Sequence, residues 1–220
     1  AYTQINHFRY KFLNLQKNRF ENIEDTVHYN RLMRKFSQTC LKDSSDINIL
    51  HIGDSHIQAG FLSNEIRRNF HRCFLSDTLP NLGFVFPYGA AGTNNPGNYN
   101  VETTGEWSSC KAVEKKRDCQ LGLSGITLKT RDTAATLQIT LRDYFPLMQY
   151  RIRQAEIFCS YPDSVYNLKI NGMNVQGEMP GNSLHIDLPR LADTLFLAVN
   201  KEKVTDTSWF RLSGDRKSVV

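Results

Sequence analysis

Long apolar runs are missing from this chain of 220 residues. Without a run of about 18 apolar residues, no segment is predicted to cross a bilayer as a helix. Glycine and proline are few, with 13 and 7 residues, which argues against a fibrous chain, and the 40% share of hydrophobic residues argues against a mainly disordered one. The length suits one large domain or two smaller ones.

A strong excess of one charge is also missing. The 27 Lys and Arg residues against 22 Asp and Glu residues leave a net charge of +5. The positive residues are scattered apart from Lys115, Lys116 and Arg117, whereas a nucleic-acid-binding protein usually carries a basic stripe with interleaved aromatic residues. We therefore predict no nucleic-acid partner, and the basic run is interpreted as a solvated hairpin tip.

Cysteine is scarce, and its spacing excludes a familiar class of site. None of the five cysteines forms a C-x-x-C pair, so neither a zinc site nor a thioredoxin-like site is predicted. Cys110 and Cys119 flank a short charged stretch and would form a local disulfide in an oxidising compartment; the alternative is five ordinary thiols. No signal peptide is visible, and a start at Ala1 rather than Met favours a trimmed, exported protein.

The first hundred residues carry the helical patterns. Apolar residues at helical spacing predict an amphipathic helix over Asn22–Cys40 and a second helix over Phe61–Phe74. Between them, residues 47–53 form a short apolar run that ends in Gly, which is typical of a buried strand in a parallel sheet. Gly53, Asp54, Ser55 and His56 would then occupy a strand-to-helix turn, the position where α/β proteins hold their chemistry.

The rest of the chain lacks helical patterns. Residues 81–98 are rich in Gly, Asn and Pro and predict a functional loop or linker. After it come short segments typical of strands, and Asn171-Gly172 is a strong hairpin-turn signal. This pattern predicts a β-sandwich or jelly roll. The predicted strands are Leu123–Lys129, Ala135–Leu141, Ile152–Ser160, Val165–Ile170, Leu184–Leu188, Thr194–Val199 and Trp209–Leu212.

Ser55 is the most informative of the polar residues. A serine after a strand is most often a helix cap, but here Gly53 permits a tight turn and the following helical N-terminus can stabilise an oxyanion. An alternative is a metallophosphatase, because Asp54 and His56 form an Asp-x-His pattern, but the further Asp, Asn and His ligands are not found downstream. No metal or organic cofactor is therefore predicted.

The segment Ile49–Gly60 resembles the first motif block of the SGNH (GDSL-type) hydrolase superfamily, and Phe84–Asn94 resembles the loop that leads into an inserted β-sandwich in its secreted bacterial members. The resemblance implies an esterase that removes acyl groups, commonly O-acetyl, from polysaccharide or peptidoglycan. It implies that Ser55 is the nucleophile and a backbone oxyanion donor, and that Asp54 orders the turn. His56 matches no catalytic position of the family.

The resemblance also implies a fold class and a division of the chain. The fold would combine part of a flavodoxin-like α/β hydrolase with an all-β sandwich. Residues 1–98 would supply the N-terminal helix, first strand and nucleophile helix, residues 99–213 the jelly-roll-like insertion, and residues 214–220 the start of the return to the hydrolase domain. The protein would be secreted or periplasmic in a bacterium.

Two family features are absent from the sequence. Neither the Asp-x-x-His block that supplies the base nor a Gly-x-Asn-Asp block occurs. We therefore expect that the catalytic base is missing from this chain, and that a complementing C-terminal segment or a second polypeptide supplies it. An unfinished sheet also predicts self-association.

The alternative function is a non-catalytic carbohydrate-binding or positioning module. In it the sandwich aromatics would stack on sugar rings. Trp107, beside Gly105 in a loop, and Asn94, in the Gly-rich loop, are the predicted substrate-binding residues, whereas Trp209 is interpreted as a core residue.

Overall fold

A computed structural model describes residues 26–40, 49–74, 82–117, 119–142, 150–175 and 183–218. The chain divides into two compact units, Ala1–Ile49 and Leu50–Val220. In the first unit, α1 (Thr26–Cys40) confirms the predicted amphipathic helix; its predicted start at Asn22 lies outside the described residues. The apolar side chains of Val27, Leu32 and Met33 on α1 are exposed.

The second unit begins with two helices, α2 (Ser55–Gln58) and α3 (Phe61–Phe74). α3 confirms the helix that was predicted over Phe61–Phe74. The predicted strand over residues 47–53 is wrong for its described part, because residues 49–53 form no strand and the side chains of Leu50 and Ile52 are more than 80% exposed. A parallel strand needs neighbours on which to bury both faces. No described strand pairs with this segment, so the α/β part of the predicted fold is not seen in the described residues.

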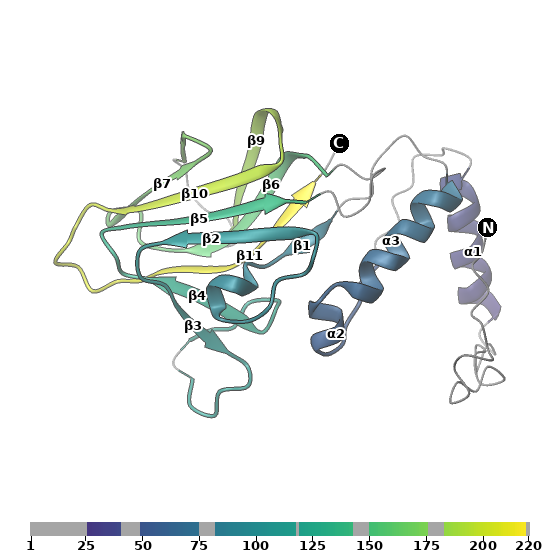
Figure 1. Ribbon diagram of the computed structural model, residues 1–220, viewed down its shortest axis with the longest axis horizontal. Helices are drawn as coiled ribbons and strands as arrows, with labels where there is room; N and C mark the ends of the chain where they lie inside the picture. Colours follow the sequence, from purple (N-terminus) through teal and green to yellow (C-terminus); the bar gives the residue numbers. More distant parts are fainter. Residues whose placement is uncertain are drawn as a thin grey trace. The chain divides into compact units, whose positions relative to one another are not determined.

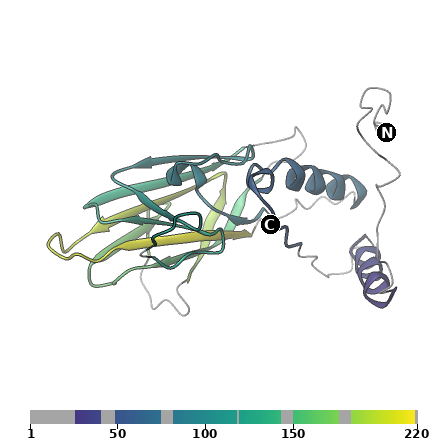
Figure 2. The same ribbon diagram turned by 90° about the horizontal axis from the view of Figure 1, so that it is seen from below.

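The body of the second unit is a β-sandwich, as predicted, built from two antiparallel sheets (Figures 1 and 2). One sheet has the order β3-β4-β11-β6-β9, with β1 also paired to β11, and the other has the order β2-β5-β10-β7-β8. The strands are β1 (Gly83–Val85), β2 (Tyr99–Thr104), β3 (Ser108–Lys111), β4 (Ile126–Thr130), β5 (Ala134–Leu141), β6 (Ile152–Ser160), β7 (Tyr166–Ile170), β8 (Met173–Val175), β9 (Ser183–Ala192), β10 (Thr194–Lys201) and β11 (Phe210–Ser218).

Alternation along the strands places the core between the sheets. On β5, Leu137 and Ile139 are buried while Gln138 between them is only partly buried, and β6 repeats the pattern with Ile157 and Cys159. Each of the seven predicted strands has an observed counterpart. Unpredicted are β1, β2, β3 and β8, which are short or polar and so lack a run of alternating apolar residues.

A tight turn and a connecting helix complete the sandwich. Asn171 has a positive φ of 47° at the β7–β8 turn, and its side chain accepts from the Phe196 N–H at 2.7 Å and donates to the Thr194 carbonyl at 3.0 Å. Between β1 and β2 lies the short 3-10 helix η2 (Tyr88–Ala91). The sandwich was predicted to span residues 99–213. It begins earlier, with β1, and ends later, because β11 runs on to Ser218.

Candidate active site

The turn that carries Ser55 is shaped by the two residues before it. A Cβ on Gly53 would lie 2.4 Å from Ile57 Cγ1, so a larger residue there would have to displace the Ile57 side chain. Asp54 is the N-cap of α2, and its carboxylate accepts the His56 N–H at 3.0 Å. The backbone hydrogen bond from His56, together with the bond to the His56 ring, lowers the pKa of Asp54. Asp54 therefore holds the turn as an ionised cap.

Ser55 is the first residue of α2 and its side chain is exposed. Its carbonyl accepts the Ala59 N–H at 2.9 Å, which closes the helical turn. Within the described ranges, neither its hydroxyl nor its backbone N–H forms a hydrogen bond. The residue thus presents a hydroxyl and a backbone donor to a ligand from solvent, the pair that acyl transfer needs at a nucleophile.

Gln58 ties this turn to the Gly-rich loop. Its Nε2 donates to Thr93 Oγ1 and to the Asn94 carbonyl, both at 2.9 Å. The loop itself is held by Asn95, whose side chain accepts the Gly89 N–H at 2.7 Å. The structure therefore brings Asn94 to the same turn as Ser55, through its backbone, while its side chain stays exposed.

Buried polar groups extend this junction along α3. Asn64 and Asn98 are 3% and 4% exposed, and the Asn98 amide donates to Asn64 Oδ1 at 3.4 Å. Arg67 donates to the same oxygen at 3.2 Å and to the Leu82 carbonyl at 3.1 Å. Burial lowers the pKa of the Arg67 guanidinium, while burial raises the pKa of the neighbouring Tyr150. A desolvated, hydrogen-bonded arginine thus ties the middle of α3 to Leu82, the residue that precedes β1.

The contacts of His51, His56 and His185 do not make any of these three a base for Ser55. His56 Nδ1 lies 3.1 Å from Asp54 Oδ1, and His51 Nδ1 lies 3.0 Å from Ser63 Oγ. His185 pairs with Glu156 across two strands at 3.4 Å. Although His56 follows Ser55 directly, consecutive helical residues diverge by about 100° and do not face each other.

Trp107, predicted to bind substrate from a loop, is partly buried. Its indole N–H donates to the carbonyls of Thr104 at 3.1 Å and Thr136 at 3.2 Å, and its ring meets Phe210 edge-on. The indole thus packs against the sandwich core and ties β2 to β5. No described contact links it to Ser55, so the structure does not bring these two predicted residues together.

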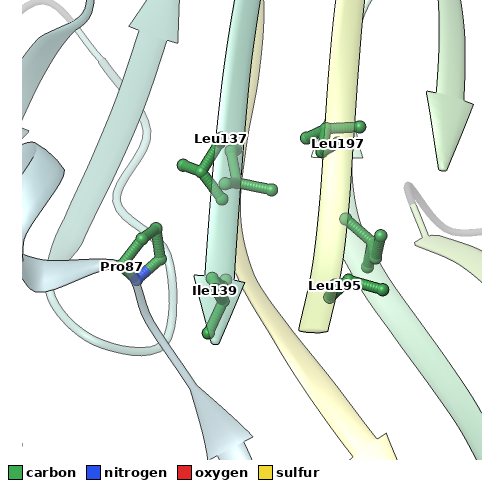
Figure 3. A pocket seen from close by; sticks show the side chains of 8 residues that line it. Pro87, Leu137, Ile139, Leu195 and Leu197 are labelled. Carbon is green, nitrogen blue, oxygen red and sulfur yellow. The ribbon is translucent and has the colours of Figure 1, made fainter. Parts of the chain in front are cut away.

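A small cavity lies inside the sandwich (Figure 3). Its volume is about 10 Å³, which holds at most one water molecule. Figure 3 shows Leu137 and Ile139 on one strand beside Leu195 and Leu197 on the next, with Pro87 at the side. Because its lining is apolar and it lies in the core, this cavity is a packing defect and not a substrate site.

The described part of the chain contains neither a metal-binding cluster nor a membrane-spanning helix. In those ranges, no three His, Cys, Asp or Glu side chains gather closely enough to hold a metal ion. Over the same ranges, no helix combines the length and the apolar character that a bilayer crossing demands. The sequence did not decide whether Cys110 and Cys119 pair or remain thiols; in the structure they form a disulfide.

Comparison with known proteins gives a fold likeness. No protein-family model and no curated protein matches the chain. A solved structure of a peptidoglycan O-acetylesterase is similar over 84% of this chain, with a TM-score of 0.57 and 19% identity, and this chain spans about half (47%) of its length. The active domain of tailspike protein 4 from bacteriophage CBA120 matches 62% of this chain and 22% of its own, at 17% identity and a TM-score of 0.32, too low to support an argument.

Two features of the structure are not evident from the sequence alone. The first is Gln58, whose link to Thr93 and Asn94 depends on a contact between segments far apart in the chain. The second is Trp209, which the sequence interpretation placed in the core but which is partly exposed between cationic side chains. The alternation Trp209-Phe210-Arg211, with Phe210 as the buried residue, is the signal that would have revealed it.

Proposed function

We propose that this chain is the nucleophile-bearing part of an SGNH-type serine esterase that removes acyl groups, chiefly O-acetyl, from polysaccharide or peptidoglycan. The observation that carries the proposal is Ser55 itself. It is exposed at the start of α2, and its hydroxyl and backbone N–H form no hydrogen bond with the residues that the structure describes. Its turn is held by the Asp54 cap and by Gln58. The fold likeness to a peptidoglycan O-acetylesterase supports this choice of reaction.

The proposed chemistry is acyl transfer through serine. The Ser55 Oγ attacks the ester carbonyl carbon, its proton passes to a base, and the sugar alcohol leaves with a proton. The Ser55 N–H stabilises the oxyanion of the tetrahedral intermediate. Water then hydrolyses the acyl-serine, which releases the carboxylic acid and restores the hydroxyl. Asp54 orders the turn and does not take up the proton.

The base is proposed to come from outside these 220 residues. His51, His56 and His185 each bond to a residue other than Ser55, which supports this arrangement. The exposed apolar side chains of Leu50, Ile52 and Phe61 mark where a complementing segment, or a second copy of the chain, would pack. In the proposed division, residues 99–213 are the insertion and residues 1–98 and 214–220 belong to the hydrolase portion, except that residues 83–85 and 214–218 lie in the sandwich strands β1 and β11.

The proposed location is outside the bacterial cytoplasm. The Cys110–Cys119 disulfide is compatible with an oxidising compartment, as is an acylated wall or capsule polysaccharide as substrate.

Hydrolysis of p-nitrophenyl acetate tests this proposal. The chain and its Ser55→Ala variant are compared alone and after addition of the segment that follows in the parent protein. We expect the added segment to raise the rate at least 100-fold with Ser55 and to leave the alanine variant at background, because a serine hydroxyl needs a base (about 10²–10⁴-fold). Equal rates for both variants in the presence of the segment would contradict the role of Ser55.

A non-catalytic carbohydrate-binding module is the second proposal. The observation that favours it is the partly exposed Trp209 on the outside of the sandwich, with Arg131 over its ring. Retention of the Ser55→Ala chain on an immobilised acylated glycan would support this function without any hydrolysis.

A further inference from the structure

The outer face of the β4–β11 pair gathers cations around one tryptophan. Phe210 pairs with Thr130 and Arg211 with Lys129, so in this antiparallel register Trp209 lies beside Arg131. The buried residues Phe210, Thr130 and Leu212 point into the core. The alternate residues Lys129, Arg131, Trp209 and Arg211 therefore share the outer face, and we call these four residues the Trp209 surface.

Lys129 of β4 and Arg131, just beyond the end of that strand, both lie over the indole ring. The Arg131 guanidinium carbon is 4.1 Å from the ring centroid of Trp209, and Lys129 Nζ is 4.8 Å from it. A guanidinium over an aromatic ring is held there by a cation–π contact and can still bind a carboxylate through its N–H donors. The arrangement is thus an arginine placed in advance for an anionic group.

The charges on this surface repel one another. Lys129 and Arg211 are directly opposed on adjacent strands, a like-charge pairing that sheets normally avoid. Among the described residues, Arg131 and Arg211 form no ion pair or hydrogen bond with a carboxylate. Asp206, the nearby acid, accepts the Ser208 N–H at 2.7 Å. Arg131 and Arg211 are therefore two cations without an acidic partner among the described residues, and a negatively charged ligand would neutralise them.

A buried tyrosine fixes the backbone that carries the pair. Tyr166 is 3% exposed, and its hydroxyl donates to the Ser208 carbonyl at 2.7 Å and lies 3.4 Å from the Thr130 carbonyl. Ser208 and Thr130 are the residues immediately before Trp209 and Arg131. The indole and the guanidinium are therefore held in register by a single buried hydroxyl, which is a built arrangement and not a chance meeting of surface side chains.

We propose that the Trp209 surface binds a carboxylated glycan. One carboxylate is held by Arg131 over the indole, a second anionic group lies against Arg211 and Lys129, and the exposed part of the Trp209 ring contacts the sugar between them. The choice of a glycan over other polyanions rests on the proposed function, whereas the requirement for negative charge rests on the surface alone. The site serves to hold the polysaccharide, and ester cleavage takes place elsewhere.

Binding of oligogalacturonate to the Ser55→Ala chain, measured by titration calorimetry, tests this inference without interference from hydrolysis. We expect each of Arg131→Gln and Arg211→Gln to weaken binding about tenfold, since each removes a charge-assisted hydrogen bond. The matched controls are the single variants Lys115→Gln and Lys116→Gln, each of which removes one positive charge, as each arginine variant does, but from an exposed loop position. We expect each control to change the affinity less than twofold.

Three outcomes would overturn the inference. The first is no binding of oligogalacturonate, and the second is an equal loss in the lysine controls, which would reveal non-specific charge attraction. The third is a ligand that binds equally well without one of the two groups. Equal binding of the methyl-esterified oligomer would show that the carboxylates are not recognised, and equal binding of poly-glutamate would show that the sugar is not recognised. Because the experiment uses a chain without Ser55, its result is independent of whether the esterase proposal holds.

Discussion

Removal of the Cys110–Cys119 disulfide should lower the stability of the sandwich by an amount that follows from the loop it closes. The two cysteines are 9 residues apart, and Cys110 lies in β3, which pairs only with β4 among the described strands. Closing a loop of this length in the unfolded chain corresponds to about 2.6 kcal/mol at 25 °C. Because edge strand β3 depends on this constraint, the free energy of unfolding of the double variant Cys110→Ala with Cys119→Ala should be lower by roughly 2–3 kcal/mol.

Urea unfolding followed by far-ultraviolet circular dichroism measures this loss. The variant should show a lower midpoint and a slope at least as steep as the parent, because the uncrosslinked unfolded chain exposes more surface. The parent chain treated with a reductant is the internal control and should shift by a similar amount. A loss below about 0.5 kcal/mol would refute the reasoning, since it would mean that the loop closure does not constrain the unfolded state.

Three further changes have defined outcomes. Asn171→Ala removes both side-chain bonds of a residue at φ 47°, and should cost about 1–2 kcal/mol by urea unfolding. Burial raises the pKa of Cys159 to about 12. The protonated thiol therefore contributes fully to the free energy of unfolding below the ordinary pKa of 9.0, and this contribution falls as the pH rises toward 12. In Cys159→Ala, the free energy of unfolding measured by urea should depend less on pH over this range. Gln58→Ala breaks both bonds to the Gly-rich loop and should speed hydrogen exchange in α2.

The sandwich was open to prediction because its strands alternate. Every second residue is apolar and buried from Ala135 to Leu141 on β5 and from Leu195 to Val199 on β10, so the pattern alone defines each strand and its inner face. The turn at Asn171 was equally readable, because few residues besides Asn and Gly adopt a positive φ. These features are local, and a sequence displays local preferences directly.

The strand over residues 47–53 could not be judged locally. Its apolar run is typical of a buried parallel strand, yet in this chain residues 49–53 are largely exposed, because burial depends on partners and not on the run itself. The Trp209 surface was hidden for the same reason. The surface forms only when Trp209 meets Lys129 and Arg131, which come from a distant segment of the chain, and Tyr166, whose hydroxyl reaches across from the opposite sheet.

Covalent labelling by a fluorophosphonate, followed by peptide mapping, tests the central claim most directly. The reagent traps an activated serine. In the protein as isolated from its natural source, we expect a single labelled peptide that contains Ser55. The 220-residue chain alone should take up label no faster than its Ser55→Ala variant. A label on another residue, or no label in the source protein, would contradict the assignment of Ser55 as the nucleophile.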